Sequence, residues 1–298
     1  IRIEKKDRTV TVHGAGLDGL RAPAALLDAG NSGSTIRMLS GILAAQPFSS
    51  RIGGDESLSR RPMDRIMKPL GAMGARIAAR DGRYPPLEIT GGKLHAIDYE
   101  LPMASAQVKT CVLFGGVFAD GATTVREPIR TRDHSELALR EFGAEIDIRG
   151  KVITLEGRPK LTGRQLTVPG DLSSAAFFIV AALIVPGSTL VIHGVGLNPT
   201  RAGLLDVLAA MGAQVQVQQL EQVSGELVGD ILIRHAPVKG GVLEGATTAA
   251  LIDEIPVLAI LGAASEEGLT VRDAAELRVK ETDRIATVAE NLKRMDVE

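Results

Sequence analysis

Apolar residues recur along the chain with two different periods. Short stretches such as KVITLEG (Lys151–Gly157) and GDILIRH (Gly229–His235) alternate apolar and polar residues, which predicts β-strands. Longer stretches carry apolar residues at helical spacing or are rich in small apolar residues, as in LSSAAFFIVAALIV, and these predict helices. Turns that contain glycine separate the two kinds of segment. The elements follow the order of a repeated β–α–β–α–β–β unit, and the pattern leaves open which element begins the unit. This order predicts an α/β protein.

One helix ending recurs along the chain at a constant interval. The strings LGAMGARI, LREFGAEI and LAAMGAQV begin at Leu70, Leu139 and Leu208, so that successive copies are 69 residues apart. A degenerate fourth copy, LKRMDVE, begins at Leu292. Each copy places Gly, or Asp in the last copy, directly after the final apolar residue, where a left-handed helix cap is favoured. We therefore predict about four copies of one βαβαββ unit.

Arginine stands at the start of the amphipathic helix in every copy. The four segments are SLSRRPMDRIM, EPIRTRDHSEL, NPTRAGLLDVL and RVKETDRIATV. A cation at a helix N-terminus is unfavourable against the helix dipole. It becomes favourable when an anion binds there, because free N–H groups and arginine both hold the anion. Duplication of a stable packing unit would explain the repeat without chemistry, whereas the arginines favour a polyanionic ligand.

The polar stretch GRPKLTGRQLTVPGD (Gly157–Asp171) predicts a domain boundary near residue 168. We expect a first domain over residues 1–168 and a second over residues 169–298, with about two copies of the repeat in each. The chain is 45% hydrophobic and 23% charged, which argues against a disordered protein. Its net charge of −2 argues against a polybasic protein that binds nucleic acids or membrane surfaces.

The single cysteine, Cys111, excludes an internal disulfide and a site built from several cysteines. The longest apolar run, Ala175–Val185, is too short to span a bilayer, which needs about 20 residues. These features predict a cytoplasmic protein with no membrane or nucleic-acid partner.

Five segments carry polar residues in unusual density beside small residues: GNSGSTIRML (Gly30–Leu39), GDESLSRRPM (Gly54–Met63), PMASAQVKT (Pro102–Thr110), LIDEIP (Leu251–Pro256) and ELRVKETDR (Glu276–Arg284). Together and in this order they resemble the 5-enolpyruvylshikimate-3-phosphate (EPSP) synthase family over essentially the whole chain. The form MASAQVK, with Ala106 where many members have a second serine, is similar to the class II branch. The resemblance implies a two-domain inside-out α/β barrel of six repeats, of which we count about four.

The resemblance implies an enolpyruvyl transferase of the shikimate pathway. The enolpyruvyl group of phosphoenolpyruvate moves to the 5-hydroxyl of shikimate 3-phosphate, phosphate is released, and glyphosate inhibits by occupying the phosphoenolpyruvate pocket. Two carboxylates and two phosphates require several Arg or Lys groups, and the addition–elimination route requires an acid and a base. No cofactor and no metal ion is implied, and we expect a monomer.

The family's site residues carry over onto matching positions of this chain. The residues that match contacts to shikimate 3-phosphate are Ser105, Ala106, Gln107, Arg132, Asp253 and Lys280. Those that match contacts to phosphoenolpyruvate are Gly33, Arg61, Gln107 and Arg284. For proton transfer the resemblance implies Asp253 as acceptor, Lys280 as its partner, and Glu281 as the acid that protonates the methylene carbon.

Ordinary structural roles remain open for the same residues. Ser105 is also a good helix N-cap. Arg132 could form an ion pair with Asp133 or Glu136. Glu281 and Arg284 could pair along one helix.

Two other functions are compatible with parts of the pattern. A UDP-N-acetylglucosamine enolpyruvyl transferase uses a loop cysteine as an acid, whereas Cys111 lies in the apolar helix string TCVLFGG, which favours a packing role. The chain could also be a non-catalytic, anion-binding fragment of the fold. The family's Gly-Asp-Lys-Ser-type and Asp-His-Arg-type segments do not occur, and Glu276 stands where other members have Asn. We therefore expect two enolpyruvyl transferase domains, the first incomplete at its N-terminus and the second at its C-terminus, and poor activity of this chain alone.

Overall fold

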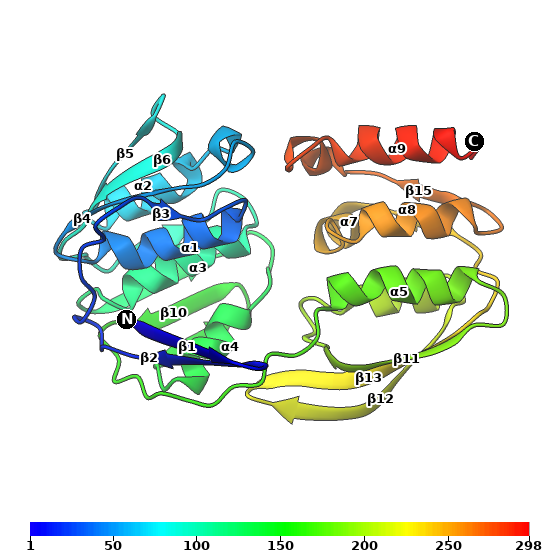
Figure 1. The fold of residues 1–298 in the computed structure, drawn as a ribbon, viewed down its shortest axis with the longest axis horizontal. Helices are drawn as coiled ribbons and strands as arrows, with labels where there is room; N and C mark the ends of the chain where they lie inside the picture. Colours follow the sequence, from blue (N-terminus) through cyan, green and yellow to red (C-terminus); the bar gives the residue numbers. More distant parts are fainter. Residues whose placement is uncertain (298) are drawn as a thin grey trace. The chain divides into compact units, whose positions relative to one another are not determined.

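The computed structural model describes residues 1–297, which form two compact units (Figure 1). The first unit is Ile1–Arg164 and the second begins at Gln165. The boundary expected near residue 168 lies close to this division, and the assignment of the units as enolpyruvyl transferase domains stays a prediction. Each unit has its own apolar core. No helix within residues 1–297 is long and apolar enough to cross a membrane.

The first unit contains two copies of the predicted βαβαββ repeat. Their elements are β3 (Leu27–Asp28), α1 (Gly33–Ala44), β4 (Ser49–Gly53), α2 (Asp64–Ala72), β5 (Arg76–Arg80) and β6 (Tyr84–Thr90), followed by β7 (Asp98–Glu100), α3 (Ala106–Gly116), β8 (Ala122–Arg126), α4 (His134–Glu141), β9 (Ile146–Arg149) and β10 (Val152–Glu156). Both copies form a four-stranded sheet with the same order, β3-β4-β6-β5 and β7-β8-β10-β9. In each sheet the first two strands are parallel and the other pairs are antiparallel. An exposed hairpin of β1 (Arg2–Lys6) and β2 (Thr9–His13) precedes them.

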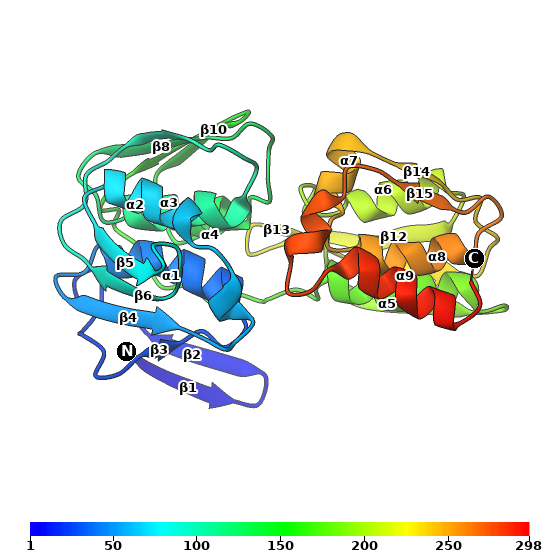
Figure 2. The same ribbon diagram turned by 90° about the horizontal axis from the view of Figure 1, so that it is seen from above.

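Helices α1 and α3 pack against each other between the two sheets of the first unit (Figure 2). A helix that is apolar on all sides needs such a buried place, and eight of the eleven residues of α3 are buried. The contact is close enough to require glycine at position 41, because a Cβ atom there would lie 2.2 Å from the carbonyl oxygen of Cys111. Small residues in these helices therefore allow the site-bearing N-termini to approach each other.

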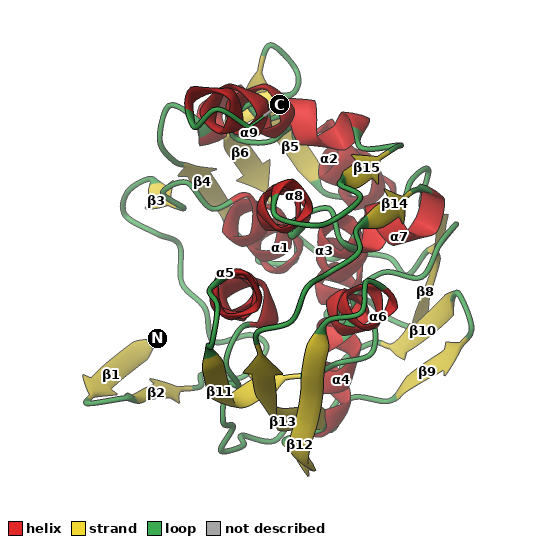
Figure 3. Cartoon of the chain, turned by 90° about the vertical axis from the view of Figure 1, so that its right-hand side faces the viewer, coloured by secondary structure: helices red, strands yellow, loops and turns green. Residues whose placement is uncertain are grey.

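The described residues of the second unit continue the repeat with a third copy and the β–α–β–α part of a fourth. Their elements are α5 (Leu172–Ile184), β11 (Thr189–Gly196), α6 (Gly203–Ala210), β12 (Gln214–Val223) and β13 (Glu226–Arg234), then β14 (Gly241–Leu243), α7 (Gly245–Ala250), α8 (Ile255–Ala263), β15 (Leu269–Val271) and α9 (Arg284–Arg294). Strands β11, β13 and β12 form an antiparallel sheet that lies along α5 and α6 (Figure 3). A parallel bridge from Gly170 to Val195 stands where a first strand stands in the other copies. Strands β14 and β15 are parallel, as the first pair of each copy is.

The recurring helix ending has the same geometry at every occurrence. The residue after the last helical turn has a positive φ in all four copies, at Gly74 (108°), Gly143 (98°), Gly212 (85°) and Asp296 (58°). In each copy the backbone amide of the next residue donates to the carbonyl oxygen of the leucine that begins the recurring sequence, with N–O distances from 2.9 to 3.1 Å. The pairs are Ala75 to Leu70, Ala144 to Leu139, Ala213 to Leu208 and Val297 to Leu292. These bonds form a Schellman cap. The prediction of about four repeats with left-handed caps is confirmed.

Candidate functional site

The N-terminus of α1 is bordered by two guanidinium groups. Ser32 is the N-cap and its hydroxyl accepts a hydrogen bond from the Thr35 amide at 3.1 Å. Gly33 is the first helical residue and is buried. A Cβ atom at Gly33 would lie 2.9 Å from Nη1 of Arg37 and 3.3 Å from Nη1 of Arg61. Only glycine leaves this space open beside both cations.

Arg37 connects α1 to α3. Its Nη1 donates to Oε1 of Gln107 at 2.8 Å, and its Nη2 donates to the carbonyl oxygen of Pro62 at 3.3 Å. Burial, and then the positive charges of Arg65 and Arg61, lower the pKa of the Arg37 guanidinium. A bound anion would relieve both causes of this shift, because it would solvate the cation and screen it from its neighbours.

Arg61 is held by Asn31 and has spare donor capacity. Its Nη2 donates to Oδ1 of Asn31 at 3.1 Å, and Asn31 in turn donates to Asp55 at 2.7 Å. The Nε atom of Arg61 is buried and has no hydrogen-bond partner among residues 1–297. The neighbouring Arg60 is exposed and pairs with Glu56, as expected for a solvated arginine.

The N-terminus of α3 lies beside that of α1. Ser105 is the N-cap of α3, and its hydroxyl accepts from the Val108 amide at 3.4 Å, which confirms the predicted capping role. Ala106 is the first helical residue and is half-buried. The side-chain Nε2 of Gln107 donates to Oγ of Ser34 at 2.8 Å. Gln107 therefore bridges the first turns of two helices whose free amides and dipoles both favour an anion.

Arg132 lies in the segment between β8 and α4 and is half-buried. Each of the two acidic residues that follow Arg132 in the chain lies beside a basic side chain. Asp133 lies 2.8 Å from Arg130, and Glu136 lies 2.6 Å from Lys109. The predicted role of Arg132 as a phosphate ligand stays a prediction.

In the second unit, Arg284 brings two of the predicted proton-transfer residues together. Its Nε and Nη2 donate to the two carboxylate oxygens of Glu281 at 2.7 and 3.0 Å. Its Nη1 donates to Oδ1 of Asp253 at 3.3 Å. The hydrogen bond to Glu281, the Glu281 charge and then Asp253 raise the pKa of Arg284, while partial burial opposes the shift. The helix ion pair between Glu281 and Arg284 is thus present, and it lies within a cluster that includes Asp253.

Lys280 follows the short 3₁₀ helix Ala275–Val279. Its Nζ lies 2.8 Å from Oε1 of Glu276, and only 23% of its side chain is exposed. Glu276, the residue that departs from the expected asparagine, therefore holds this lysine in an ion pair. Asp283 caps α9 by accepting from the Ala286 amide at 3.0 Å and so fixes the start of the helix at Arg284.

The turn that carries Asp253 is held by a hydrogen-bond network around a buried glutamate. Glu254 is 3% exposed and accepts a hydrogen bond from the Ser173 hydroxyl. Arg201 donates to Ser173 at 2.7 Å and also to Asp171, the N-cap of α5. Arg201, the arginine of the third copy, thus holds Ser173, which in turn binds Glu254, the residue next to Asp253.

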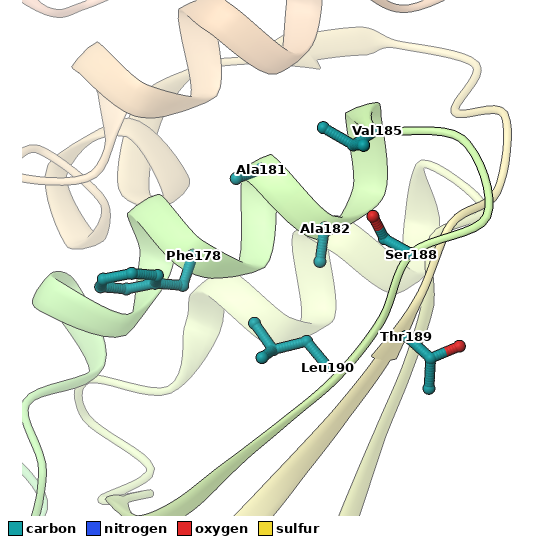
Figure 4. A pocket seen from close by; sticks show the side chains of 7 residues that line it. All are labelled: Phe178, Ala181, Ala182, Val185, Ser188, Thr189 and Leu190. Carbon is teal, nitrogen blue, oxygen red and sulfur yellow. The ribbon is translucent and has the colours of Figure 1, made fainter.

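Two other features lie apart from these clusters. Cys111 is fully buried and burial raises the pKa of its thiol, which confirms the predicted packing role. A hollow of about 280 Å³ is lined by residues of α5 and β11 and the turn between them, most of them apolar, such as Phe178, Val185 and Leu190 (Figure 4). None of the predicted site residues is among the residues that line this hollow.

The sequence analysis singled out the motif GNSGSTIR but assigned a role in the site only to Gly33, and not to Arg37 or Asn31. A usable signal existed, because Arg37 is four residues after Gly33 and so lies on the same face of α1. Lys109 was also missed, and its buried contacts with residues distant in sequence left no local signal.

Comparison with known proteins agrees with this geometry. The family model for EPSP synthase (3-phosphoshikimate 1-carboxyvinyltransferase) matches residues 1–298. A protein of that name from Solibacter usitatus is 69% identical over 297 residues, which are 100% of this chain and 70% of that protein. Another from Koribacter versatilis is 54% identical over 294 residues, which are 99% of this chain and 68% of that protein.

A solved structure of EPSP synthase from Acinetobacter baumannii superposes with a TM-score of 0.86 at 47% identity, covering 98% of this chain and 66% of that chain. The chain therefore spans about two thirds of these relatives, and its fold is the two-domain inside-out α/β fold that the family resemblance implied. By the match along its whole length and by this fold, the chain belongs to the EPSP synthase family, the 3-phosphoshikimate 1-carboxyvinyltransferases.

Proposed function

We propose that this chain carries substrate-binding and proton-transfer residues for the transfer of the enolpyruvyl group of phosphoenolpyruvate to the 5-hydroxyl of shikimate 3-phosphate. In this reaction the 5-hydroxyl gives its proton to a base and its oxygen adds to C2 of phosphoenolpyruvate, while the methylene carbon takes up a proton from an acid and becomes a methyl group. Loss of one methyl proton and of phosphate then re-forms the carbon–carbon double bond and yields the enol ether. The proposal rests on family membership and on the chemistry of the two side-chain clusters.

The observation that carries the proposal is the pair of guanidinium groups around Gly33. Nη1 of Arg37 and Nη1 of Arg61 both lie within 3.3 Å of the position that a Cβ atom would occupy. The α1 N-terminus adds free amides at the same place. This arrangement suits the phosphate or carboxylate of phosphoenolpyruvate, since arginine forks match planar and tetrahedral oxyanions.

For shikimate 3-phosphate we propose Ser105, Ala106, Gln107, Arg132, Asp253 and Lys280 as contacts. Gln107 also belongs to the phosphoenolpyruvate contacts, together with Gly33, Arg61 and Arg284. Its two polar atoms are oriented by Ser34 and Arg37, which supports a role in positioning both ligands.

For proton transfer we propose Asp253 as the base for the 5-hydroxyl, Lys280 as its partner, and Glu281 as the acid for the methylene carbon. The ion pairs of Arg284 with both carboxylates support this assignment, because substrate anions can compete for the same guanidinium and release the carboxylates for chemistry. A purely structural ion pair would show no such change when ligands bind.

The test compares Arg61→Ala with the matched control Arg60→Ala, in protein expressed from the complete reading frame that encodes these residues. Phosphate release is measured with both substrates. We expect Arg61→Ala to lower kcat/KM for phosphoenolpyruvate by about 100-fold or more, as removal of a positioned donor typically does. Arg60→Ala should stay near the parent value, because Arg60 is exposed and pairs with the exposed side chain of Glu56.

Two outcomes would overturn the proposal. Equal kinetics for the Arg61 and Arg60 variants would remove the Gly33 cluster from the site. Binding of both substrates in titration calorimetry without phosphate release would favour the non-catalytic alternative. A Cys111→Ala variant with unchanged turnover would in turn count against the chemistry of the UDP-N-acetylglucosamine relatives.

A cytoplasmic location and a monomeric state are part of the proposal. The single cysteine is free and buried, which fits a reducing compartment. Cell fractionation and light scattering of the expressed protein test these two points.

A further inference from the structure

A fully buried lysine lies in α3, two residues after Gln107. Lys109 has 0% exposure, and its Nζ lies 2.6 Å from Oε1 of Glu136 and 3.2 Å from Oε2 of Glu127. The side chains of both glutamates are only 1% exposed. Burying three charges is costly, and apolar residues of similar volume often serve stability as well or better. Stability alone therefore does not account for this cluster.

Glu127 uses its second oxygen to hold the segment that carries Arg132. Its Oε1 accepts from the backbone amide of Thr131 at 3.2 Å and from the Thr131 hydroxyl. A carboxylate can accept at both oxygens, whereas an amide has only one accepting oxygen. One carboxylate thus joins α3 to the residue directly before Arg132.

A separate hydrogen bond joins α3 to α4 and does not involve Thr131 or Arg132. The hydroxyls of Thr110 and Ser135 lie 2.6 Å apart and connect α3 to α4. This contact can be removed separately, so packing of α3 on α4 can be distinguished from positioning of Arg132.

We propose that Lys109, Glu127 and Thr131 form a chain of positioning residues that holds Arg132 against the shikimate 3-phosphate subsite and so determines the affinity for the phosphate of that substrate. The inference rests on the proposed function, in which Arg132 binds this phosphate. The Lys109–Glu127 contact fixes the carboxylate relative to the first turn of α3, where Ser105 and Gln107 are. The Glu127–Thr131 bonds then fix Arg132 relative to the same turn.

The experiment measures KM for each substrate and kcat for Thr131→Ala, Arg132→Ala and the double variant, in protein from the complete reading frame. Ser135→Ala is the matched control. Thr131→Ala removes one donor to Glu127 and leaves the buried ion pair intact. We expect it to raise KM for shikimate 3-phosphate about 3- to 10-fold, the effect of one hydrogen bond. KM for phosphoenolpyruvate and kcat should stay within about 2-fold, the scatter expected for an uninvolved site, and Ser135→Ala should leave all three unchanged.

The double variant distinguishes positioning from general structural damage. If Thr131 acts through Arg132, then Thr131→Ala should cause no further loss when Arg132 is already alanine. Additive losses would overturn the inference, because they indicate a separate structural effect. Equal constants for Thr131→Ala and Ser135→Ala would overturn it too.

A variant that perturbs the buried charges directly provides a second measurement. Glu127→Gln keeps the volume but cannot accept from both Lys109 and Thr131. We expect the same selective rise in KM for shikimate 3-phosphate, larger than that of Thr131→Ala. If Arg132→Ala itself leaves this KM unchanged, the proposed role of Arg132 fails and the inference falls with it. If Arg132→Ala raises it and the Thr131 and Glu127 variants do not, only the inference falls.

Discussion

Replacing Gly33 with alanine places one methyl group between two arginines of the first unit. The new Cβ atom would be 2.9 Å from Nη1 of Arg37, whereas ordinary contact begins at 3.4 Å. Arg37 must therefore retreat by about 0.5 Å, while Arg61, at 3.3 Å, has to shift much less. Both neighbours are the ends of flexible side chains, so we expect the fold to persist and the substrate site to change.

The cost is expected to fall mainly on the bond between Arg37 and Gln107. That bond is 2.8 Å long, and hydrogen bonds to charged groups contribute about 1.5–3 kcal/mol. Stretching it by a few tenths of an ångström should lose about 1 kcal/mol, which corresponds to about a 5-fold rise in KM for phosphoenolpyruvate. Glyphosate is longer, so the methyl group should clash with it first. Overpacking of a tight site costs about 1–3 kcal/mol, or about 5- to 150-fold in its inhibition constant.

The assay measures KM for phosphoenolpyruvate and the inhibition constant of glyphosate against it, for the parent protein and for Gly33→Ala. Gly71→Ala is the matched control, since Gly71 is exposed in α2 and an added Cβ would meet no atom of residues 1–297 within 4 Å. We expect the ratio of inhibition constant to KM to rise only for Gly33→Ala. The same ratio in both variants, or a tolerant parent, would refute the steric reasoning and assign glyphosate tolerance to other residues.

Three further predictions concern the second unit. Glu281→Gln should lower kcat about 100-fold or more with little change in KM, because general acid catalysis contributes at least that much; near-normal kcat would leave Glu281 only as the ion-pair partner of Arg284. Ser173→Ala removes the hydroxyl that donates to the buried Glu254 and should lower the free energy of unfolding by about 1–3 kcal/mol, so an unchanged urea midpoint would contradict it. The Ala286 amide, and then the other partners of Asp283, lower the pKa of that carboxyl, so its capping contribution is present above about pH 4 and is lost as the pH falls through the lower folded-state pKa. The stability difference between the parent and Asp283→Ala, measured by urea unfolding, should therefore shrink as the pH is lowered from about 6 to 3, and a constant difference would show that the charge of Asp283 contributes nothing.

The repeat was readable in the sequence because its determinants are local. A glycine after the last turn of a helix adopts positive φ with little strain. The sequence alone therefore predicts three helix ends, at Gly74, Gly143 and Gly212. Ser105 could be recognised as an N-cap in the same way, since the bond it accepts comes from Val108, three residues later. Interactions over three to five residues depend on the backbone conformation of one segment, and that conformation is encoded there.

The composition of the candidate site was decided by tertiary packing. Arg37 and Gln107 are 70 residues apart and meet because α1 and α3 approach closely at Gly41. Lys109 is in the first turn of a helix, where a sequence alone indicates a solvated side chain, but the neighbouring segments bury it between Glu127 and Glu136. The sequence by itself thus determined the repeats, their caps and the motifs that mark the family. The partners of each charged group depended on which helices pack together, because side chains far apart in the chain interact only once packing has brought their backbones within reach and removed water from between them.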